Sequence, residues 1–171
     1  MKQIRILKYI TFVILLTIAN SCKINYSFTG ASISPLVKTY TVYDFTNSAQ
    51  MINPTLTDYV AEQLRDKFTR QTSLTYTNDG GDLEFEGVVT GYDVKPISVQ
   101  TGDIASENRL TIRINVKFTN NIDPDNDFDS DFSAYADFSS QQIISDVEDE
   151  LIEIIIKQIV EDVFNRSVAN W

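Results

Sequence analysis

The residue types that most often carry out chemistry in proteins are scarce in this sequence. The 171 residues include no histidine and a single cysteine, Cys22. Histidine is the most frequent general base and metal ligand, so its absence removes the commonest routes to acid–base and metal catalysis. No nucleotide-binding glycine loop, nucleophile elbow or paired-cysteine motif occurs either. Acidic residues are plentiful, but no two of them are singled out as a hydrolytic pair. We therefore expect a protein that is not an enzyme and needs no cofactor.

Five aspartates occur at alternate positions in the stretch NIDPDNDFDSD. Asp123, Asp125 and Asp127 match the first ligands of a calcium-binding EF-hand loop. The sixth position of that loop needs glycine and the twelfth needs glutamate, but this chain has Phe128 and Ala134 there. A turn followed by the exposed face of a strand explains the pattern better, and we expect no metal site.

The single cysteine follows a segment with the features of an export signal. Residues 1–8 carry three positive charges, and residues 9–19 are predominantly apolar. That apolar run is too short to span a bilayer, which takes about 20 residues, but it suits the core of a signal peptide. Ser21 is the small residue expected before a cleavage site, and a lone cysteine cannot form an internal disulfide. The stretch LTIANSCKIN resembles a bacterial lipoprotein signal, which implies that acyl chains such as palmitate are attached to Cys22. The alternative is an ordinary signal peptide followed by an unmodified cysteine.

The chain after this signal is acidic and has the size of one domain. We expect residues 1–21 to be a lipoprotein signal peptide, residues 22–37 a lipidated tether and residues 38–171 a single folded domain. The full chain has 14 basic and 24 acidic residues, and removing the three basic residues of the signal leaves 11 against 24, a net charge of about −13. Nucleic acids bind basic surfaces, so we expect no nucleic-acid partner. Anionic membranes also repel such a chain, so its membrane attachment must come from acyl chains on Cys22.

Hydrophobic periodicity predicts how the folded domain begins. Residues 38–45 are rich in residues that favour a β-strand. Asn53 and Pro54 are typical of the start of a helix, and we expect this helix to cover residues 54–72. Its apolar residues recur every four positions and form one stripe: Leu56, Val60, Leu64 and Phe68.

Three further strands are predicted in the middle of the chain. Residues 83–99 form a long strand in which Gly87 and Gly91 indicate a bend or a bulge. Residues 109–120 alternate strictly between apolar and polar side chains, and the alternation resumes over residues 128–138 after a turn, which predicts a β-hairpin. Placing Phe118 opposite Phe128 also pairs Lys117 with Asp129, Asn115 with Asp131 and Arg113 with Ser133.

The last segment, residues 140–171, is predicted to be helical. Ser145 and Glu148 have the spacing of a capping box, and acidic residues crowd the first turns. One apolar stripe is expected to face the core: Val147, Leu151, Ile155, Ile159 and Val163, widened by Ile144, Ile154 and Phe164. Three more apolar residues lie beside this stripe and belong either to a wider core face or to a partner contact: Ile152, Ile156 and Val160.

The predicted order of elements is strand, helix, three strands and a final helix (β-α-β-β-β-α). Amphipathic helices and half-apolar strands must bury their apolar faces against one another. We therefore predict an α+β fold, a two-layer sandwich with two helices on one face of a four-stranded mixed sheet. The opposite face of the sheet is expected to be polar. The order of the strands within the sheet does not follow from periodicity.

Several stretches of the chain resemble one bacterial protein family. They are NYSFTGASISP after the cysteine, NPTLTDYVAEQLRDKFTRQTSL, LEFEGVVTGYDVKPI, NRLTIRINVKFTN and VEDELIEIIIKQIVEDVFNRSVANW. Together they cover most of the chain that follows Cys22. They are similar to the LptE-like lipopolysaccharide-assembly lipoproteins of the Bacteroidetes type.

This resemblance implies an outer-membrane lipoprotein that plugs the LptD-type barrel translocon, helps it assemble and assists delivery of lipopolysaccharide to the outer leaflet. The implied partners are the LptD-type β-barrel, lipopolysaccharide and the membrane, which is reached through Cys22. In similar lipoproteins an acidic cluster after the cysteine often marks export to the cell surface. Residues 23–26 contain no acid, which favours an outer-membrane location facing the periplasm. The alternative is a free-standing periplasm-facing lipoprotein that serves as a binding or scaffold module.

Three basic residues of the predicted polar sheet face are candidates for contact with lipopolysaccharide phosphates. Arg113 has no acid opposite it in the predicted hairpin register, and Arg109 lies at the start of its strand. Arginine presents a planar fork of donors that fits phosphate. Together with Lys95 on the preceding strand, these two residues form what we call the basic patch. The alternative is that its members balance nearby aspartates on a solvated face.

Overall fold

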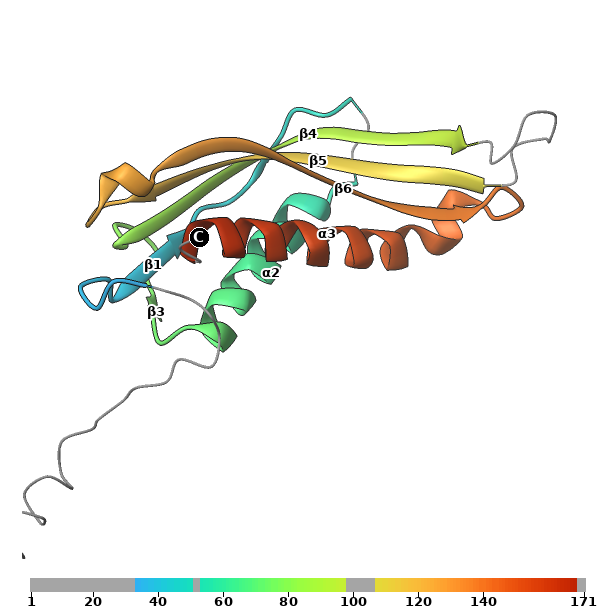
Figure 1. The fold of residues 1–171 in the computed structure, drawn as a ribbon. Coiled ribbons are helices and arrows are strands. Elements are labelled where there is room, and N and C mark those ends of the chain that lie inside the picture. The colour runs from blue at the N-terminus through green and yellow to red at the C-terminus, as the bar shows by residue number, and fades with distance from the viewer. Residues whose placement is uncertain (1–32, 51–52, 98–106, 169–171) are drawn as a thin grey trace, which may run out of the picture.

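The computed structural model describes residues 33–50, 53–97 and 107–168, which form two layers (Figure 1). Helices α2 (Leu56–Gln71) and α3 (Ile144–Val168) lie against one face of a β-sheet. The strands are β1 (Thr39–Val42), β2 (Thr46–Asn47), β3 (Thr75–Tyr76), β4 (Leu83–Ile97), β5 (Glu107–Asn120) and β6 (Phe128–Ser139). The predicted α+β class is confirmed. Cys22, the signal peptide and most of the expected tether lie outside the described residues.

The described part of the sheet has six strands rather than the predicted four, in the order β3-β1-β4-β5-β6, with β2 also paired to β4. Strands β1 and β2 run parallel to β4, whereas β4, β5 and β6 are antiparallel neighbours. The two strands that the prediction missed, β2 and β3, have two residues each. Two residues are too few to show an alternation, so only their pairing with β4 and β1 reveals them.

Helix α2 carries the predicted apolar stripe, and all four of its residues are buried. The helix begins at Leu56, two residues after the predicted start. The Asn53 carboxamide oxygen accepts hydrogen bonds from the Thr55 amide (3.1 Å) and hydroxyl (2.8 Å). Asn53 therefore stabilises the entry to the helix, although the turn that it closes precedes the helix itself.

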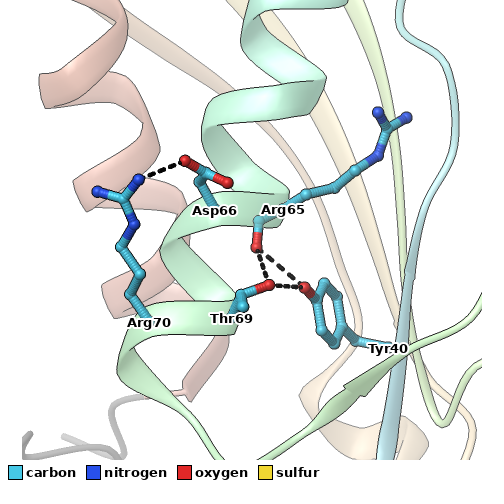
Figure 2. A network of polar contacts seen from close by, with 5 residues as sticks. All are labelled: Tyr40, Arg65, Asp66, Thr69 and Arg70. Carbon is cyan, nitrogen blue, oxygen red and sulfur yellow. Dashed lines mark hydrogen bonds and ion pairs between the residues drawn. The ribbon is translucent and has the colours of Figure 1, made fainter.

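The Tyr40 hydroxyl fixes α2 to β1 (Figure 2). It donates to the Arg65 carbonyl (2.9 Å) and lies 2.8 Å from the Thr69 hydroxyl. Its ring is buried and stacks on Phe68, with the ring centroids 5.2 Å apart. A buried hydroxyl that lost these partners would destabilise the fold, so this contact defines how the helix sits on the sheet.

A bulge in β4 keeps apolar side chains on the inner face, which is the face that the helices cover. Val89 and Tyr92 are both buried, although they lie three positions apart in the strand. The register with β5 shifts between Val89 and Gly91, which confirms the predicted irregularity. One extra residue reverses the side to which the following side chains point. As a result, Asp93 and Lys95 face outward.

Helix α3 begins at Ile144, so Ser145 lies inside the helix and the predicted capping box is wrong. A turn precedes this start, in which the Gln142 amide donates to the Ser139 carbonyl (3.0 Å), and the Asp146 amide then donates to the Ile143 carbonyl (3.0 Å). The Ser145 hydroxyl contacts the Asp146 carboxylate (3.4 Å) instead of a backbone amide.

The apolar surface of α3 is wider than one stripe. Ile152, Ile156 and Val160 are buried, and α3 packs against α2 as well as against the sheet. Of the two predicted roles for these residues, the structure therefore supports the wider core face rather than a partner contact. Ile154, which we predicted to widen the core stripe, is instead 50% exposed.

Candidate functional site

The polar groups of the fold gather on the outer face of the sheet, away from the helices. Leu110 and Phe118 of β5 are buried on the inner face, so the residues between them alternate outward. The observed register of β5 and β6 is the predicted one, with Phe118 opposite Phe128. The basic patch and its acidic neighbours thus lie on one continuous surface, which we call the outer face.

Arg109 is held by an acid on the neighbouring strand. It lies opposite Asp137, and its guanidinium donates to both carboxylate oxygens, at 2.7 and 2.8 Å. The guanidinium also stacks 3.7 Å from the ring centroid of Tyr135. The hydrogen bonds from Arg109 lower the pKa of the Asp137 carboxyl below its usual range. We did not predict Asp137 as the partner of Arg109, because we followed the register of the hairpin only as far as Ser133.

Arg113 is held by an acid on the other neighbouring strand. It forms an ion pair with Asp93 of β4. Its guanidinium lies over Gly91, where an added Cβ would be 2.5 to 2.7 Å from guanidinium atoms. The prediction that no acid lies opposite Arg113 in the hairpin is correct, since Ser133 is there. The acid comes from β4, because the bulge directs Asp93 to the outer face.

Lys95 lies directly opposite Arg109 in the β4–β5 register and is exposed. The structure therefore brings the basic patch together at one end of the outer face. Both arginines of the patch are already paired with carboxylates of the chain, as the alternative interpretation expects. A contact between the patch and phosphate stays a prediction.

Lys117 has a different partner from the predicted one. It lies opposite Asp129, as expected, but its ammonium is 3.3 Å from the carboxylate of Glu86 on β4. The acids of β6 bind Asn115 instead, because its carboxamide donates hydrogen bonds to Asp129 (2.9 Å) and Asp131 (3.1 Å). A lysine in a central strand has neighbouring strands on both sides, and either can supply its acidic partner. The register of the hairpin alone therefore does not predict which acid pairs with Lys117.

Beside Lys117 the outer face forms a groove of about 420 Å³. Tyr43 and Asp44 contribute to its wall, and sequence reasoning did not identify them as surface residues of a site. We assigned both to the first strand, which ends at Val42. The Tyr43 hydroxyl donates to Asp79 (2.8 Å), and this hydrogen bond raises the pKa of the tyrosine. No sequence motif marks this groove.

The aspartates between β5 and β6 form structural hydrogen bonds. The Asp127 carboxylate accepts the Asn120 amide (2.7 Å), and the Asp123 carboxylate accepts the Asn126 carboxamide (2.7 Å). Within residues 33–50, 53–97 and 107–168, no group of three potential metal-binding side chains occurs. In the same part of the chain, neither helix is long and apolar enough to cross a bilayer.

Solved structures from several bacteria are similar to this chain. Protein XCC0632 from Xanthomonas campestris is 10% identical with a TM-score of 0.50, covering 81% of this chain and 90% of its own. The PelC dodecamer from Paraburkholderia phytofirmans is 8% identical (TM-score 0.49; 81% and 95% covered). Rare lipoprotein B from Shewanella oneidensis is 10% identical (TM-score 0.42; 74% and 89% covered). At such low identity these likenesses concern the fold alone.

No curated protein sequence matches the chain significantly. The family model described as LptE, lipopolysaccharide-assembly, matches residues 37–167. This match begins before β1 and ends in the last turn of α3, so it includes both layers. The chain therefore belongs to the LptE family of lipopolysaccharide-assembly proteins.

Proposed function

We propose that this chain is a lipid-anchored outer-membrane protein that faces the periplasm and plugs an LptD-type β-barrel translocon. In this role it helps the barrel assemble and assists the delivery of lipopolysaccharide to the outer leaflet. It acts by binding, without catalysing a reaction. Acyl chains on Cys22 attach it to the membrane.

The observation that carries this proposal is the family match over residues 37–167, which spans the whole two-layer domain. The outer face is compatible with the role, because the lumen of a membrane barrel is polar. Three of its cations are paired within the protein, Arg109 with Asp137, Arg113 with Asp93 and Lys117 with Glu86. The face can also contact a polar wall through its exposed hydrogen-bonding groups.

Co-purification tests this proposal against a free-standing lipoprotein. The full chain with a C-terminal affinity tag is extracted from its native membrane in a mild non-ionic detergent and purified. A barrel plug is expected to bring one integral outer-membrane β-barrel protein with it in a constant ratio. Cells depleted of the chain should then contain less folded barrel and less surface lipopolysaccharide. Purification of the chain alone, together with normal surface lipopolysaccharide after depletion, would contradict the proposal.

For direct contact with lipopolysaccharide, we propose the basic patch. The fork that Arg109 presents to a carboxylate also fits a phosphate, so phosphate would exchange with Asp137. The test replaces Arg109 and Arg113 by glutamine and measures lipopolysaccharide binding. The control replaces Arg70 and Lys157, two cations of the helix layer, by glutamine. We expect weaker binding only in the first variant, with both proteins folded. Equal lipopolysaccharide binding by both variants would contradict the proposal and would mean that the two arginines only balance nearby aspartates.

A further inference from the structure

Strand β6 forms one margin of the sheet, and α3 runs beneath it (Figure 1). Its pairing with β5 extends from Phe128 to Ser139, and no strand in the described parts of the chain pairs with its other side. Backbone amide and carbonyl groups along such an edge are a template for another strand. The opposite margin, β3, has only two residues, whereas β6 has twelve. Of the two margins, β6 is the one long enough to accept a strand.

A groove of mixed polar and apolar lining lies below this edge. Its volume is about 450 Å³, and it opens between the end of β6 and the first turns of α3. Its apolar wall comes from Phe138, Val147, Leu151 and Ile154, and the rest of its lining is polar: Glu107, Asp137, Ser139, Gln142 and Glu150. Ile154 is 50% exposed, although it lies in a helix whose other apolar residues are mostly buried. A strand added to β6 would point alternate side chains to this inner side and could cover Val147 and Ile154.

Three of the outward side chains of β6 are aspartates. Asp137 is bound by Arg109, whereas Asp129 and Asp131 share the neutral carboxamide of Asn115. Within the described part of the chain, neither Asp129 nor Asp131 forms an ion pair. Because side chains opposite each other on neighbouring strands interact, basic residues at the outward positions of an added strand would meet these carboxylates.

Charge disfavours two central registers in which β6 could pair with a second copy of the chain. Antiparallel pairing of β6 with itself about Ser133 would place Asp129 opposite Asp137. Pairing about Ala134 would place Asp131 opposite Asp137. Like charges directly opposite each other destabilise a sheet. The same acids that oppose self-pairing therefore favour a basic partner.

We propose that the free side of β6 is a strand-addition site for an extended segment of a partner protein in which lysine or arginine alternates with apolar residues. Backbone hydrogen bonds along β6 supply affinity, and the alternation supplies specificity. The basic side chains lie on the outer side, beside Asp129 and Asp131. The apolar side chains lie on the inner side, against Val147 and Ile154. This site differs from the basic patch, and it does not depend on the partner being a barrel.

The test uses the full chain in a non-ionic detergent and the synthetic peptide acetyl-KVKVKVK-amide as a probe. Backbone hydrogen exchange is measured with and without the peptide. The expected result is slower exchange in residues 128–139, and no slowing with acetyl-EVEVEVE-amide, which has the same alternation and the opposite charge. Equal effects of the two peptides, or protection that maps only outside β6, would overturn the proposal.

Two matched pairs of variants test the two sides of the site. Replacing Asp129 and Asp131 by asparagine should weaken binding of the lysine peptide roughly 2- to 30-fold, since two cross-strand charge pairs are lost. Replacing Asp58 and Asp149 of the helix layer by asparagine makes the same change in net charge and should leave binding nearly unchanged.

The second pair concerns the groove below β6. Ile154→Gln should weaken binding, whereas Ile143→Gln should not, because the exposed Ile143 is not part of the groove. Circular dichroism establishes that all variants fold. If the members of either matched pair bind alike, the proposal is wrong.

Measurements on the chain alone decide whether the edge is already occupied. We expect a monomer in sedimentation and rapid exchange of the β6 amides that do not bond to β5. A dimer with protected β6 amides would identify a second copy as the occupant. Protection that disappears when residues 23–32 are deleted would identify the chain's own segment. Either result would overturn the proposal.

Discussion

Gly87 lies in the middle of β4, directly under the ring of Phe45. A Cβ added at Gly87 would lie 2.0 Å from the nearest ring atom, which no side chain tolerates without movement. Phe45 is buried, so its ring has little room to move away. The glycine that weakens the strand in isolation is therefore required by packing.

We expect Gly87→Ala to lower the free energy of unfolding by about 1–3 kcal/mol, the usual cost of overpacking a core. Urea unfolding monitored by circular dichroism measures this loss. The same substitution in a Phe45→Leu background should cost less, because the smaller side chain leaves space for the methyl group. An equal loss in both backgrounds would contradict this explanation.

Asp82 holds the start of β1 in place. Its carboxylate accepts the backbone amides of Lys38 (2.7 Å) and Thr39 (2.9 Å), and the Thr39 hydroxyl accepts the Asp82 amide (2.9 Å). The two backbone hydrogen bonds lower the pKa of the Asp82 carboxyl below its usual range. A carboxyl whose pKa is lower in the folded state stabilises the fold above the unfolded pKa of about 4 and loses this effect as the pH falls through the folded pKa.

We therefore expect Asp82→Asn to be less stable than the parent at neutral pH, and the difference to shrink as the pH falls below about 4. Thermal unfolding over a series of pH values measures this difference. Asp125→Asn in the β5–β6 loop is the charge-matched control and should differ little from the parent at any pH. A constant deficit of Asp82→Asn down to the lowest pH would show that the charge of Asp82 is not what stabilises β1.

At the scale of elements, α3 joins the two layers through two faces. One face covers the sheet, and the other packs against α2, where Lys67 of α2 forms an ion pair with Glu161. Ile156 is fully buried, whereas Ile154, two residues before it, is half exposed. Neighbouring isoleucines of one helix therefore have different roles, which a comparison of single substitutions can measure.

We expect Ile156→Ala to lower the free energy of unfolding by about 2–5 kcal/mol, because it leaves a cavity in the core. Ile154→Ala should cost less than about 1 kcal/mol, because much of that side chain already contacts solvent. Chemical denaturation of both variants checks this contrast, and each serves as the control for the other because they share one helix and one chemical change. Similar losses would mean that Ile154 is covered in solution.

At the scale of the whole molecule, the domain and its attachment are separate features. The described elements of both layers lie within residues 39–168, whereas the expected lipidation site, Cys22, precedes them. The domain can then keep its fold when the attachment is lost, and a change at Cys22 should affect location without affecting stability.

We expect Cys22→Ala protein from cells to lack acyl mass and to move from the membrane fraction to the soluble fraction, because several acyl chains are needed for durable attachment. Intact mass spectrometry and membrane fractionation measure the two effects, and circular dichroism checks that the domain still folds. Wild-type protein without acyl mass would contradict the prediction of a lipoprotein.

The sequence by itself determined the features that depend on neighbours along the chain. The stripe of α2, the alternation of β5 and β6 and their hairpin register all follow from periods of 3.6 and 2, which side-chain direction imposes locally. The capping box of α3 was predicted wrongly, because the helix begins at Ile144, where the Asp146 amide bonds to the Ile143 carbonyl and no Ser145 cap forms.

Only the tertiary structure decided which segments meet. The short strands β2 and β3 exist through pairing with distant residues, and the bulge in β4 places Asp93 beside Arg113. The sequence identified the members of the basic patch, but their carboxylate partners depend on the register of three strands at once. Contacts between distant segments arise from burial and strand pairing, so the hydrophobic period of any one segment does not predict them.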